Sequence, residues 1–363
     1  MLFWRRGNCK LVSMEESGKS GQHVMTMSAQ PRDYEARVAA EKDVFKDCVN
    51  VHDLPAIFHY WSDGKIRPQL EVFGFSGPVG MFEKYLEQQC ASTTDRVLRF
   101  VSVGAGNCDL EIELAQALIR KGWQNFVIDC LDLNPDMLER GRAAADQNRV
   151  ADRLSFVEAD FNNWHPSRKY DAVVANQALH HVVNLEGLFG QIQGALAPRG
   201  RFIISDMIGR NGHKLWPEAL EIVHEFWRQL PEQYRHNQAL QQRYEELYEN
   251  WDCSIESFEG IRAQDILPLL LEFFHFEFFY GCGNIIDPFV GRAFGPNFDP
   301  NRPWDREFID RVHERDQQEM AAGRIKPTHM LAVVGNDRER PTVFREPLSP
   351  QFCVRTPDQI QTL

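Results

Sequence analysis

From about residue 97 onward, the chain alternates short β-rich runs with amphipathic helical stretches. Runs of β-branched and aromatic residues predict buried strands, whereas apolar residues three and four positions apart predict helices that pack on a sheet. This alternation indicates a parallel sheet with helices on both faces, a doubly wound Rossmann-like α/β fold. The strands are expected at residues 97–103, 126–132, 153–157, 170–175 and 201–207.

Two helix starts in this region carry local signals. Asn134 can cap a helix that has Pro135 at its first position and runs to about Asn148. Asn184 can cap the next helix, which is expected to end before the Pro-Arg-Gly sequence at 198–200.

The regular alternation stops after the fifth strand. Residues 212–272 are expected to be mostly helical, and residues 282–327 to form a loop rich in Gly and Pro followed by one polar helix. Further strands are expected near 274–281 and 329–335. The order predicts seven strands, the last pair antiparallel, with 212–272 and 282–327 as insertions in a domain over 96–335.

The segments outside this domain have different compositions. Residues 1–30 are polar and are expected to form a disordered tail, whereas 31–95 are mainly helical and could cover the ligand edge of the sheet. Residues 336–363 are expected to be an extended tail.

Charge and cysteine usage restrict the partners. The net charge of −12 opposes attraction to a polyanion, so no nucleic-acid partner is expected. No apolar stretch approaches the ~18 to 20 residues of a membrane span, so no membrane partner is expected either. The eight cysteines form no C-x-x-C pair and no short Cys/His spacing, which predicts reduced thiols in a cytoplasmic protein and no metal site. Nothing in the sequence indicates an oligomeric state.

A glycine-containing turn follows the first strand at residues 103–107, Val-Gly-Ala-Gly-Asn. Glycines let a backbone approach a ligand closely, and the following helix offers free N–H groups, but NAD and FAD sites and ligand-free tight loops use the same device. Asp132 closes the second strand, where an acid can accept hydrogen bonds from both hydroxyls of a ribose. Asp109 occupies the position of the third glycine of the dinucleotide fingerprint, which disfavours NAD.

With these motifs in this order, the chain resembles the class I S-adenosylmethionine (SAM)-dependent methyltransferase family. The resemblance rests on 103–106 and 131–138, and on the segments 158–161 and 171–181 after and across the next two strands. It implies SAM as the cofactor, with Asp160 at the adenine amino group, Phe161 beside the ring and Asn176 near the methionine part. The other cofactor residues implied are Gly104, Ala105, Gly106, Asn107, Asp132 and Leu133. The chain departs from the family at Ser102, where many members have an acid, and at Cys108, where many have a small residue.

Candidates for the acceptor side follow later strands, because ligands of open α/β sheets bind outside the carboxyl ends of the strands. His181, Asp206 and His213 are predicted to be catalytic, as a base or as groups that orient the acceptor. Further substrate-binding candidates are Tyr60, Trp61, His180, Arg210, Trp216, Arg292 and Asn297. For each of them, an ordinary role in the core, in a turn or in a structural loop is the alternative.

The resulting hypothesis is transfer of a methyl group from SAM to a small or medium organic acceptor, most simply a hydroxyl of a sugar or natural product. A protein acceptor, or a nitrogen or carbon acceptor, is the alternative within the same class. A non-catalytic SAM-fold binding protein and a nicotinamide-dependent oxidoreductase are the alternatives from other classes.

Overall fold

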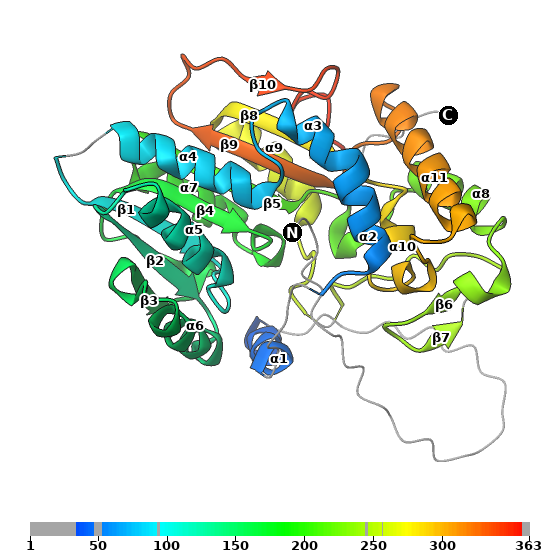
Figure 1. Ribbon diagram of the computed structural model, residues 1–363, viewed down its shortest axis with the longest axis horizontal. Coiled ribbons are helices and arrows are strands. Elements are labelled where there is room, and N and C mark those ends of the chain that lie inside the picture. The colour runs from blue at the N-terminus through cyan, green and yellow to red at the C-terminus, as the bar shows by residue number, and fades with distance from the viewer. Residues whose placement is uncertain (1–33, 47–52, 93–94, 244–245, 256, 358–363) are drawn as a thin grey trace.

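The computed structural model describes residues 34–46, 53–92, 95–243, 246–255 and 257–357 (Figure 1). The tail expected at 1–30 lies outside these residues. Within the described ranges, no helix is long and apolar enough to cross a membrane.

One sheet organises the molecule, with the strand order β10-β8-β9-β5-β4-β1-β2-β3. The predicted strands are β1 (Leu98–Val103), β2 (Phe126–Asp132), β3 (Leu154–Glu158), β4 (Tyr170–Asn176), β5 (Leu196–Met207), β8 (His275–Cys282) and β9 (His329–Gly335). Strands β1 to β5 are parallel, and β9 runs antiparallel to both β5 and β8. The predicted fold class is confirmed. The tail adds one short edge strand, β10 (Val343–Phe344), parallel to β8.

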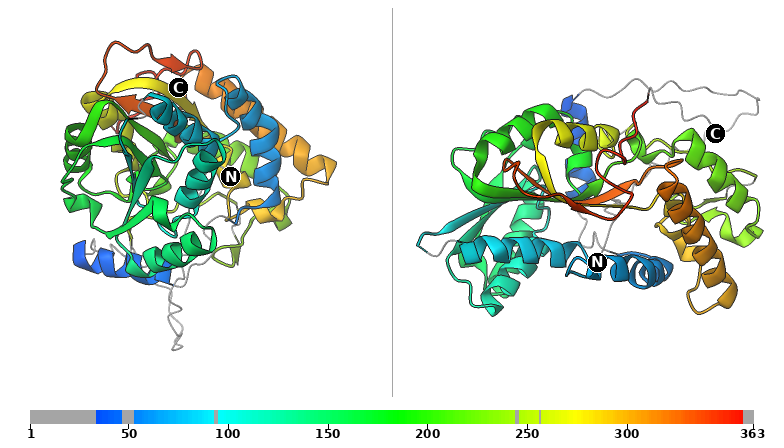
Figure 2. Two further views of the ribbon diagram at one scale, coloured as in Figure 1. Left: turned by 60° about the vertical axis from the view of Figure 1, so that its left-hand side comes forward. Right: turned by 90° about the horizontal axis from the view of Figure 1, so that it is seen from above.

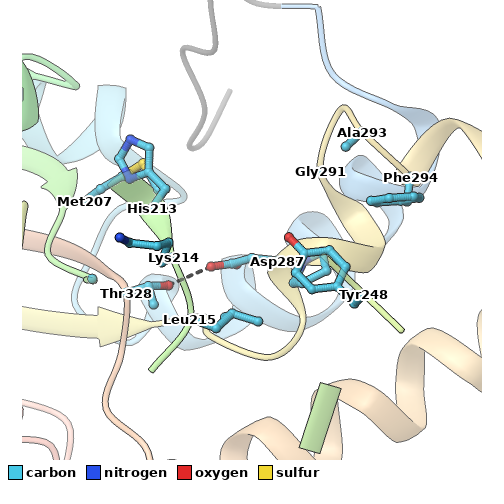
Figure 3. A pocket seen from close by; sticks show the side chains of 12 residues that line it. Met207, His213, Lys214, Leu215, Tyr248, Asp287, Gly291, Ala293, Phe294 and Thr328 are labelled. Carbon is cyan, nitrogen blue, oxygen red and sulfur yellow. Dashed lines mark hydrogen bonds between the residues drawn. The ribbon is translucent and has the colours of Figure 1, made fainter. Parts of the chain in front are cut away.

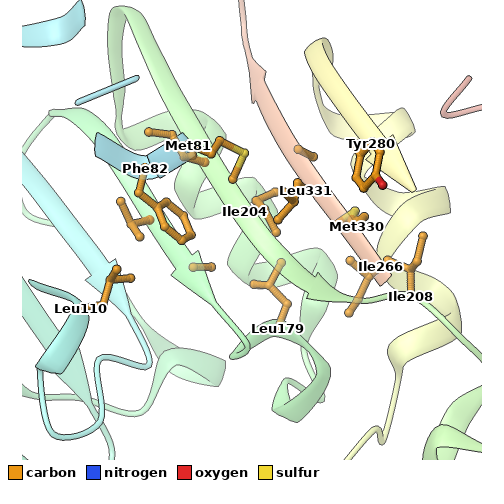
Figure 4. Packing of buried hydrophobic residues seen from close by; sticks show 14 of the residues in the cluster. Met81, Phe82, Leu110, Leu179, Ile204, Ile208, Ile266, Tyr280, Met330 and Leu331 are labelled. Carbon is orange, nitrogen blue, oxygen red and sulfur yellow. The ribbon is translucent and has the colours of Figure 1, made fainter. Parts of the chain in front are cut away.

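Helices cover both faces of this sheet (Figures 1 and 2). On one face lie α4 (Pro78–Ser92) and α5 (Asp109–Arg120), and on the other lie α7 (Leu185–Ala195) and α9 (Ala263–Phe273). Figure 4 shows Met81 and Phe82 of α4 directed at the sheet, where Ile204 is also buried. Each of these fully buried side chains contributes roughly 1.5–3 kcal/mol by removal of apolar surface from water.

The two predicted helix caps are present. The Asn134 side chain accepts a hydrogen bond from the Asp136 N–H at 3.0 Å and starts α6 (Pro135–Gln147). The Asn184 side chain accepts one from the Gly187 N–H at 3.1 Å and starts α7. Both helices therefore begin where local side-chain chemistry satisfies an otherwise unpaired N–H group.

The N-terminal segment is mainly helical in the part that the structure describes. It contains α1 (Tyr34–Lys46), α2 (Ala56–Trp61), a π-helical turn at Ser62–Ile66 and α3 (Arg67–Glu71). Helix α2 contacts α11 (Pro303–Ala321), because Trp61 Nε1 donates to His313 Nδ1 at 3.1 Å and the Tyr60 hydroxyl donates to Asp310 at 3.1 Å.

The expectation that residues 212–272 are mostly helical is wrong. Within the described part of this segment, the α-helices are α8 (Pro217–Trp227) and α9, and a small hairpin, β6 (His236–Asn237) with β7 (Gln242–Arg243), lies between them. Aromatic residues of its irregular part pack on other segments: the Tyr248 ring lies 5.6 Å from that of Trp227 and 5.9 Å from that of Phe294, centroid to centroid. Tertiary packing overrides local propensity here.

Candidate active site

A cavity of about 630 Å³ lies at the carboxyl ends of β1, β2 and β4. Its wall combines residues of the turns after these strands with residues of α1 and of the segment before α9. The lining residues are Glu41, Lys42, Gly104, Asp132, Leu133, Asn134, Met137, Phe161, Asn162, Gln177, Ala178, His181 and Phe258.

The turn after β1 requires glycine at position 104 for two reasons. Gly104 has φ +73°, a left-handed conformation that side chains strain, and a Cβ atom added there would lie 2.5 Å from the Cβ of Ala178. The Gly104 and Ala105 N–H groups donate to the Leu131 carbonyl at 2.9 Å. The glycine thus lets the ends of β1, β2 and β4 approach each other at the cavity wall.

Asp132 is fixed by backbone donors at the same wall. Its carboxylate accepts from the Gly106 N–H at 2.7 Å and from the Asn134 N–H at 2.8 Å, and the residue is 9% exposed. Hydrogen bonds from two backbone N–H groups hold a carboxylate in one orientation. Asp132 therefore holds the glycine turn closed while still lining the cavity.

The segment after β3 connects the cavity to α1. Asp160 accepts hydrogen bonds from the Tyr34 hydroxyl at 2.6 Å and from the Asn162 N–H at 2.9 Å. Burial alone would raise the pKa of Asp160, but these donors lower it, so the group is a carboxylate. Its neighbour Phe161 lines the cavity.

Both departures from the family pattern have structural counterparts. The Ser102 hydroxyl donates to Glu111 Oε1 at 2.5 Å, so an acid from α5 lies next to the position where many members have one. Cys108 has φ +60°, and a Cβ atom at Gly141 would lie 2.8 Å from its sulfur. Gly141 of α6 therefore makes the room that the larger side chain at 108 needs.

Three histidines surround Glu259 beside the cavity. His213 Nε2 lies 2.9 Å from Glu259 Oε1, His180 Nε2 lies 3.6 Å from the same oxygen, and His181 Nε2 lies 3.5 Å from Oε2. On the far side, His181 Nδ1 lies 2.9 Å from Glu41 Oε1, and His180 Nδ1 lies 2.6 Å from Asp206 Oδ1. We call these four residues, His180, His181, His213 and Glu259, the histidine cluster.

The charges of the cluster are mutually dependent. Burial alone would lower the pKa of His181, but Glu41 and Glu259 raise it to about 9. Burial alone would raise the pKa of Glu259, but His181, His213 and His180 hold it well below its usual range. Asp206 also has a lowered pKa despite its burial, because of His180 and the N–H groups of Leu179 and Met207.

A second cavity of about 520 Å³ lies next to the cluster (Figure 3). Met207 at the end of β5 and His213 in the segment after it line this cavity, and Thr328 donates to Asp287 at 2.7 Å across its wall. The complete lining is Met207, Gly209, His213, Lys214, Leu215, Tyr248, Asp287, Pro288, Gly291, Ala293, Phe294 and Thr328. His181 lines the first cavity and His213 the second, and both contact Glu259, so the cluster lies between them.

The predicted cofactor residues lie around the first cavity to different degrees. Its lining includes Gly104, Asp132, Leu133 and Phe161. Ala105, Gly106, Asn107, Asp160 and Asn176 are not among its lining residues, and Gln177, which follows Asn176, is. Asn107 instead accepts a hydrogen bond from Arg140 at 3.0 Å.

Of the predicted acceptor-side residues, the structure brings His180, His181, Asp206 and His213 together. Asp206 is fully buried and accepts from the N–H groups of Ala178, Leu179 and Met207, so it positions His180 and does not face a cavity.

The other acceptor-side candidates do not line either of the two cavities described. Their side chains are held elsewhere, as follows: Tyr60 and Trp61 contact α11, Arg210 stacks on Trp216, Arg292 donates to the Asp53 carbonyl, and Asn297 binds the carbonyls of Tyr234 and His236.

Sequence reasoning missed Glu259, Glu41 and Phe258. Glu259 lies in the segment expected to be helical, and its partner His213 is 46 positions away. No local spacing signals such a contact. Glu41 was inside the predicted helical segment, but nothing in the sequence assigned a side chain of that segment to His181.

Comparison with known proteins agrees with this geometry. Residues 95–264 match a family model described as a methyltransferase domain. The match indicates that residues 95–264 form a methyltransferase domain of the class I SAM-dependent type, whose cofactor is SAM.

Individual relatives match over shorter stretches. Malonyl-[acyl-carrier protein] O-methyltransferase 2 of Ilyobacter polytropus is 25% identical over 112 residues, which are 31% of this chain and 40% of that protein. Sterol 24-C-methyltransferase ERG6B of Gibberella zeae is 34% identical over 73 residues, 20% of this chain and 19% of that protein. The chain thus spans less than half the length of these curated relatives.

Among solved structures, the O-methyltransferase of a trans-AT PKS multienzyme of Brevibacillus brevis, in complex with S-adenosyl-L-homocysteine, is similar with a TM-score of 0.41. It is 13% identical, and the match covers 80% of this chain and 85% of that one.

Proposed function

We propose that this protein transfers a methyl group from SAM to a hydroxyl of a small or medium organic acceptor, such as a sugar or natural product. The observation that carries the proposal is the pairing of two cavities across the histidine cluster. The first adjoins the glycine turn and Asp132, and the second is lined by residues of both insertions.

The first cavity fits the cofactor by the chemistry of its lining. Asp132 supplies a fixed carboxylate for ribose hydroxyls, Phe161 supplies an aromatic face for a base, and Gly104 keeps the turn free of a side chain. Bound there, SAM supplies an already activated methyl group. The protein's own residues then have only to orient the acceptor and accept its proton.

The acceptor side fits a small molecule. The second cavity is lined by Tyr248, Phe294 and Leu215 as well as by the polar side chains of Asp287, Thr328 and Lys214. Apolar walls with a few placed polar groups are typical of small-molecule sites. His181 and His213 are the cluster members that line cavities, so they are the ones placed to orient or deprotonate a hydroxyl.

A carbon acceptor is the second candidate. It is supported by the partial similarity to sterol 24-C-methyltransferases, whereas the similarity to a malonyl-[acyl-carrier protein] O-methyltransferase supports oxygen. Acidity of the whole chain, with net charge −12, opposes a nucleic-acid acceptor for either chemistry.

Two measurements test the proposal in sequence. A thermal-shift assay with SAM, S-adenosylhomocysteine and NADH should show concentration-dependent stabilisation by the first two only, because a ligand of the native state raises its stability. Transfer of radiolabelled methyl from SAM to a panel of hydroxylated and carbon-nucleophile acceptors then identifies the atom. Stabilisation by NADH alone would refute the cofactor assignment, and labelling of carbon acceptors only would refute the hydroxyl assignment.

A further inference from the structure

We propose that His180, His213 and Glu259 bind a divalent transition-metal ion between the two cavities. The inference does not depend on methyl transfer. It rests on three observations: the distances between the candidate ligand atoms, the fixed orientation of the His180 ring, and the number of buried carboxylates around the cluster.

The candidate ligand atoms are close enough to share one ion. One atom from each of the three side chains lies within 4.8 Å of the others. The separations from Glu259 Oε1 are 2.9 Å to His213 Nε2 and 3.6 Å to His180 Nε2. Nitrogen and oxygen ligands about 2.0–2.2 Å from an ion lie roughly 3–3.5 Å from each other, so small side-chain movements suffice for coordination.

His180 is oriented as a metal ligand. Asp206 accepts backbone N–H bonds from Ala178, Leu179 and Met207, so its carboxylate acts as an acceptor and the 2.6 Å contact is made by a proton on His180 Nδ1. Nε2 then faces Glu259 Oε1 at 3.6 Å, where it could coordinate an ion in place of a proton. This nitrogen belongs to a fully buried side chain and has no hydrogen-bond partner in the part of the chain that the structure describes. A carboxylate on the second nitrogen is the usual support of a metal-bound histidine.

The surrounding charges also favour a cation. Asp206, Glu259 and Glu41 are largely buried around the cluster, with side chains 0%, 11% and 16% exposed. Across the described ranges, the ion pairs of these three carboxylates are all with histidines and none is with lysine or arginine. A bound dication would compensate this excess of carboxylates, and two imidazoles with one carboxylate suit Zn²⁺, Co²⁺ or Fe²⁺ better than Mg²⁺ or Ca²⁺.

Such an ion would have room for an outside ligand, because three protein ligands leave at least one coordination position open. His213 lines the second cavity, so that position is available to a molecule bound there. If the proposed function holds, a hydroxyl acceptor at the ion would be both oriented and made more acidic.

The test measures metal binding directly. The full chain, purified without a histidine tag and stripped with a chelator, is titrated with Zn²⁺ against a chromophoric chelator and with Co²⁺ by visible absorption. We expect one equivalent of tightly bound ion. His213→Asn and Glu259→Gln should each weaken binding more than ~100-fold, a larger loss than the 10- to 100-fold typical of outer partners.

These variants are chosen to fold. His213 has φ +55°, which asparagine tolerates, and Glu259→Gln keeps the side-chain shape. His329→Asn is the matched control, because His329 is also buried and lies 3.1 Å from Asp287 but is outside the cluster. Circular dichroism and SAM-induced thermal shift verify folding. A folded wild-type protein that binds no stoichiometric ion overturns the proposal, as does equal loss of binding in His329→Asn.

Discussion

The two halves of the site are assembled in different ways. The cofactor side is built from turns that directly follow β1, β2 and β3, and its key contacts join residues of neighbouring strands, such as Asp132 with Gly106. The acceptor side is built from segments far apart in sequence that meet at Glu259. Local sequence motifs therefore predict the first half, whereas the second half depends on contacts between residues far apart in the sequence.

This contrast has an energetic counterpart. On the cofactor side, backbone N–H groups fix a single carboxylate, so a substitution there changes the shape of the turn. On the acceptor side, buried charged side chains hold each other in place. A substitution there leaves a buried polar group without its partner, which lowers the free energy of unfolding by about 1–3 kcal/mol or more. The following predictions separate the two halves.

The largest effect is expected at the glycine turn. Gly104→Val should abolish measurable SAM binding and lower stability by several kcal/mol, because it adds backbone strain and a clash with Ala178. Calorimetric titration with SAM and urea unfolding measure both. Gly122→Val is the control, since Gly122 has φ +90° with nothing within 4 Å of an added Cβ and should show the strain alone. Wild-type SAM affinity in Gly104→Val would show that this turn is not the cofactor loop.

The next effect is expected on the acceptor side. His213→Asn should reduce methyl transfer at saturating acceptor by about 100-fold or more, the usual contribution of a positioned catalytic group, while the Kd for SAM stays within about twofold. Single-turnover kinetics and calorimetry measure the two quantities. A parallel loss of SAM affinity and turnover would mean that the two halves of the site are not separable.

A somewhat smaller effect is expected at the ribose position. Asp132→Ala should weaken SAM binding by about 1.5–3 kcal/mol, because it removes a charged acceptor. The variant should also have a lower free energy of unfolding, since the Gly106 and Asn134 N–H groups lose their acceptor. The exposed Asp136→Ala serves as the control and should leave affinity unchanged. Unaltered SAM affinity in folded Asp132→Ala would remove Asp132 from the cofactor site.

The smallest effect concerns a buried histidine away from the cluster. Burial, with Lys65 and Arg345, lowers the pKa of His313 from 6.5 to about 4. As the pH falls from about 6.5 to 4, His313 of the unfolded chain binds a proton, whereas His313 of the folded chain stays neutral. The free energy of unfolding is therefore highest above pH 6.5 and falls as the pH is lowered through this range. Between pH 7 and 5 the wild type should lose about 1–2 kcal/mol more than His313→Asn, in which an amide oxygen can still accept from Trp61. Equal pH dependence of the two proteins in urea unfolding would contradict the assignment.

The sequence predicts the sheet and the turns beside the first cavity well because both depend on short-range patterns. The predicted bounds of β2 and β9 agree with the structure residue for residue, and the caps at Asn134 and Asn184 are present. Seven strands followed from periodicity, but β10 did not, because a two-residue edge strand has no periodicity to read.

The acceptor side was predictable only in part. His181, His213 and Asp206 were predicted for the acceptor side because they follow strands whose carboxyl ends meet at one edge of the sheet. The structure brings them together around Glu259 and His180, but Asp206 is fully buried against His180. Glu259 has no such marker, since it lies in an irregular segment whose position is fixed by packing of the insertion. Trp61 and Arg292 were attributed to the pocket by residue type. In the structure, Trp61 joins α2 to α11. Arg292, in the loop after α10 (Asp287–Val290), donates to the Asp53 carbonyl.

Helix α1 gives the cavity a property that the sheet alone would not. Polar contacts join its described side chains to the rest of the protein, including Tyr34 with Asp160, Glu41 with His181, and Arg37 with the Ser254 carbonyl. A single helix joined through partly buried polar contacts opens at a lower free energy than the core of the sheet. We therefore expect ligand exchange to proceed through detachment of α1 while the sheet stays folded. Bound S-adenosylhomocysteine should then slow amide hydrogen exchange in α1 far more than in α4.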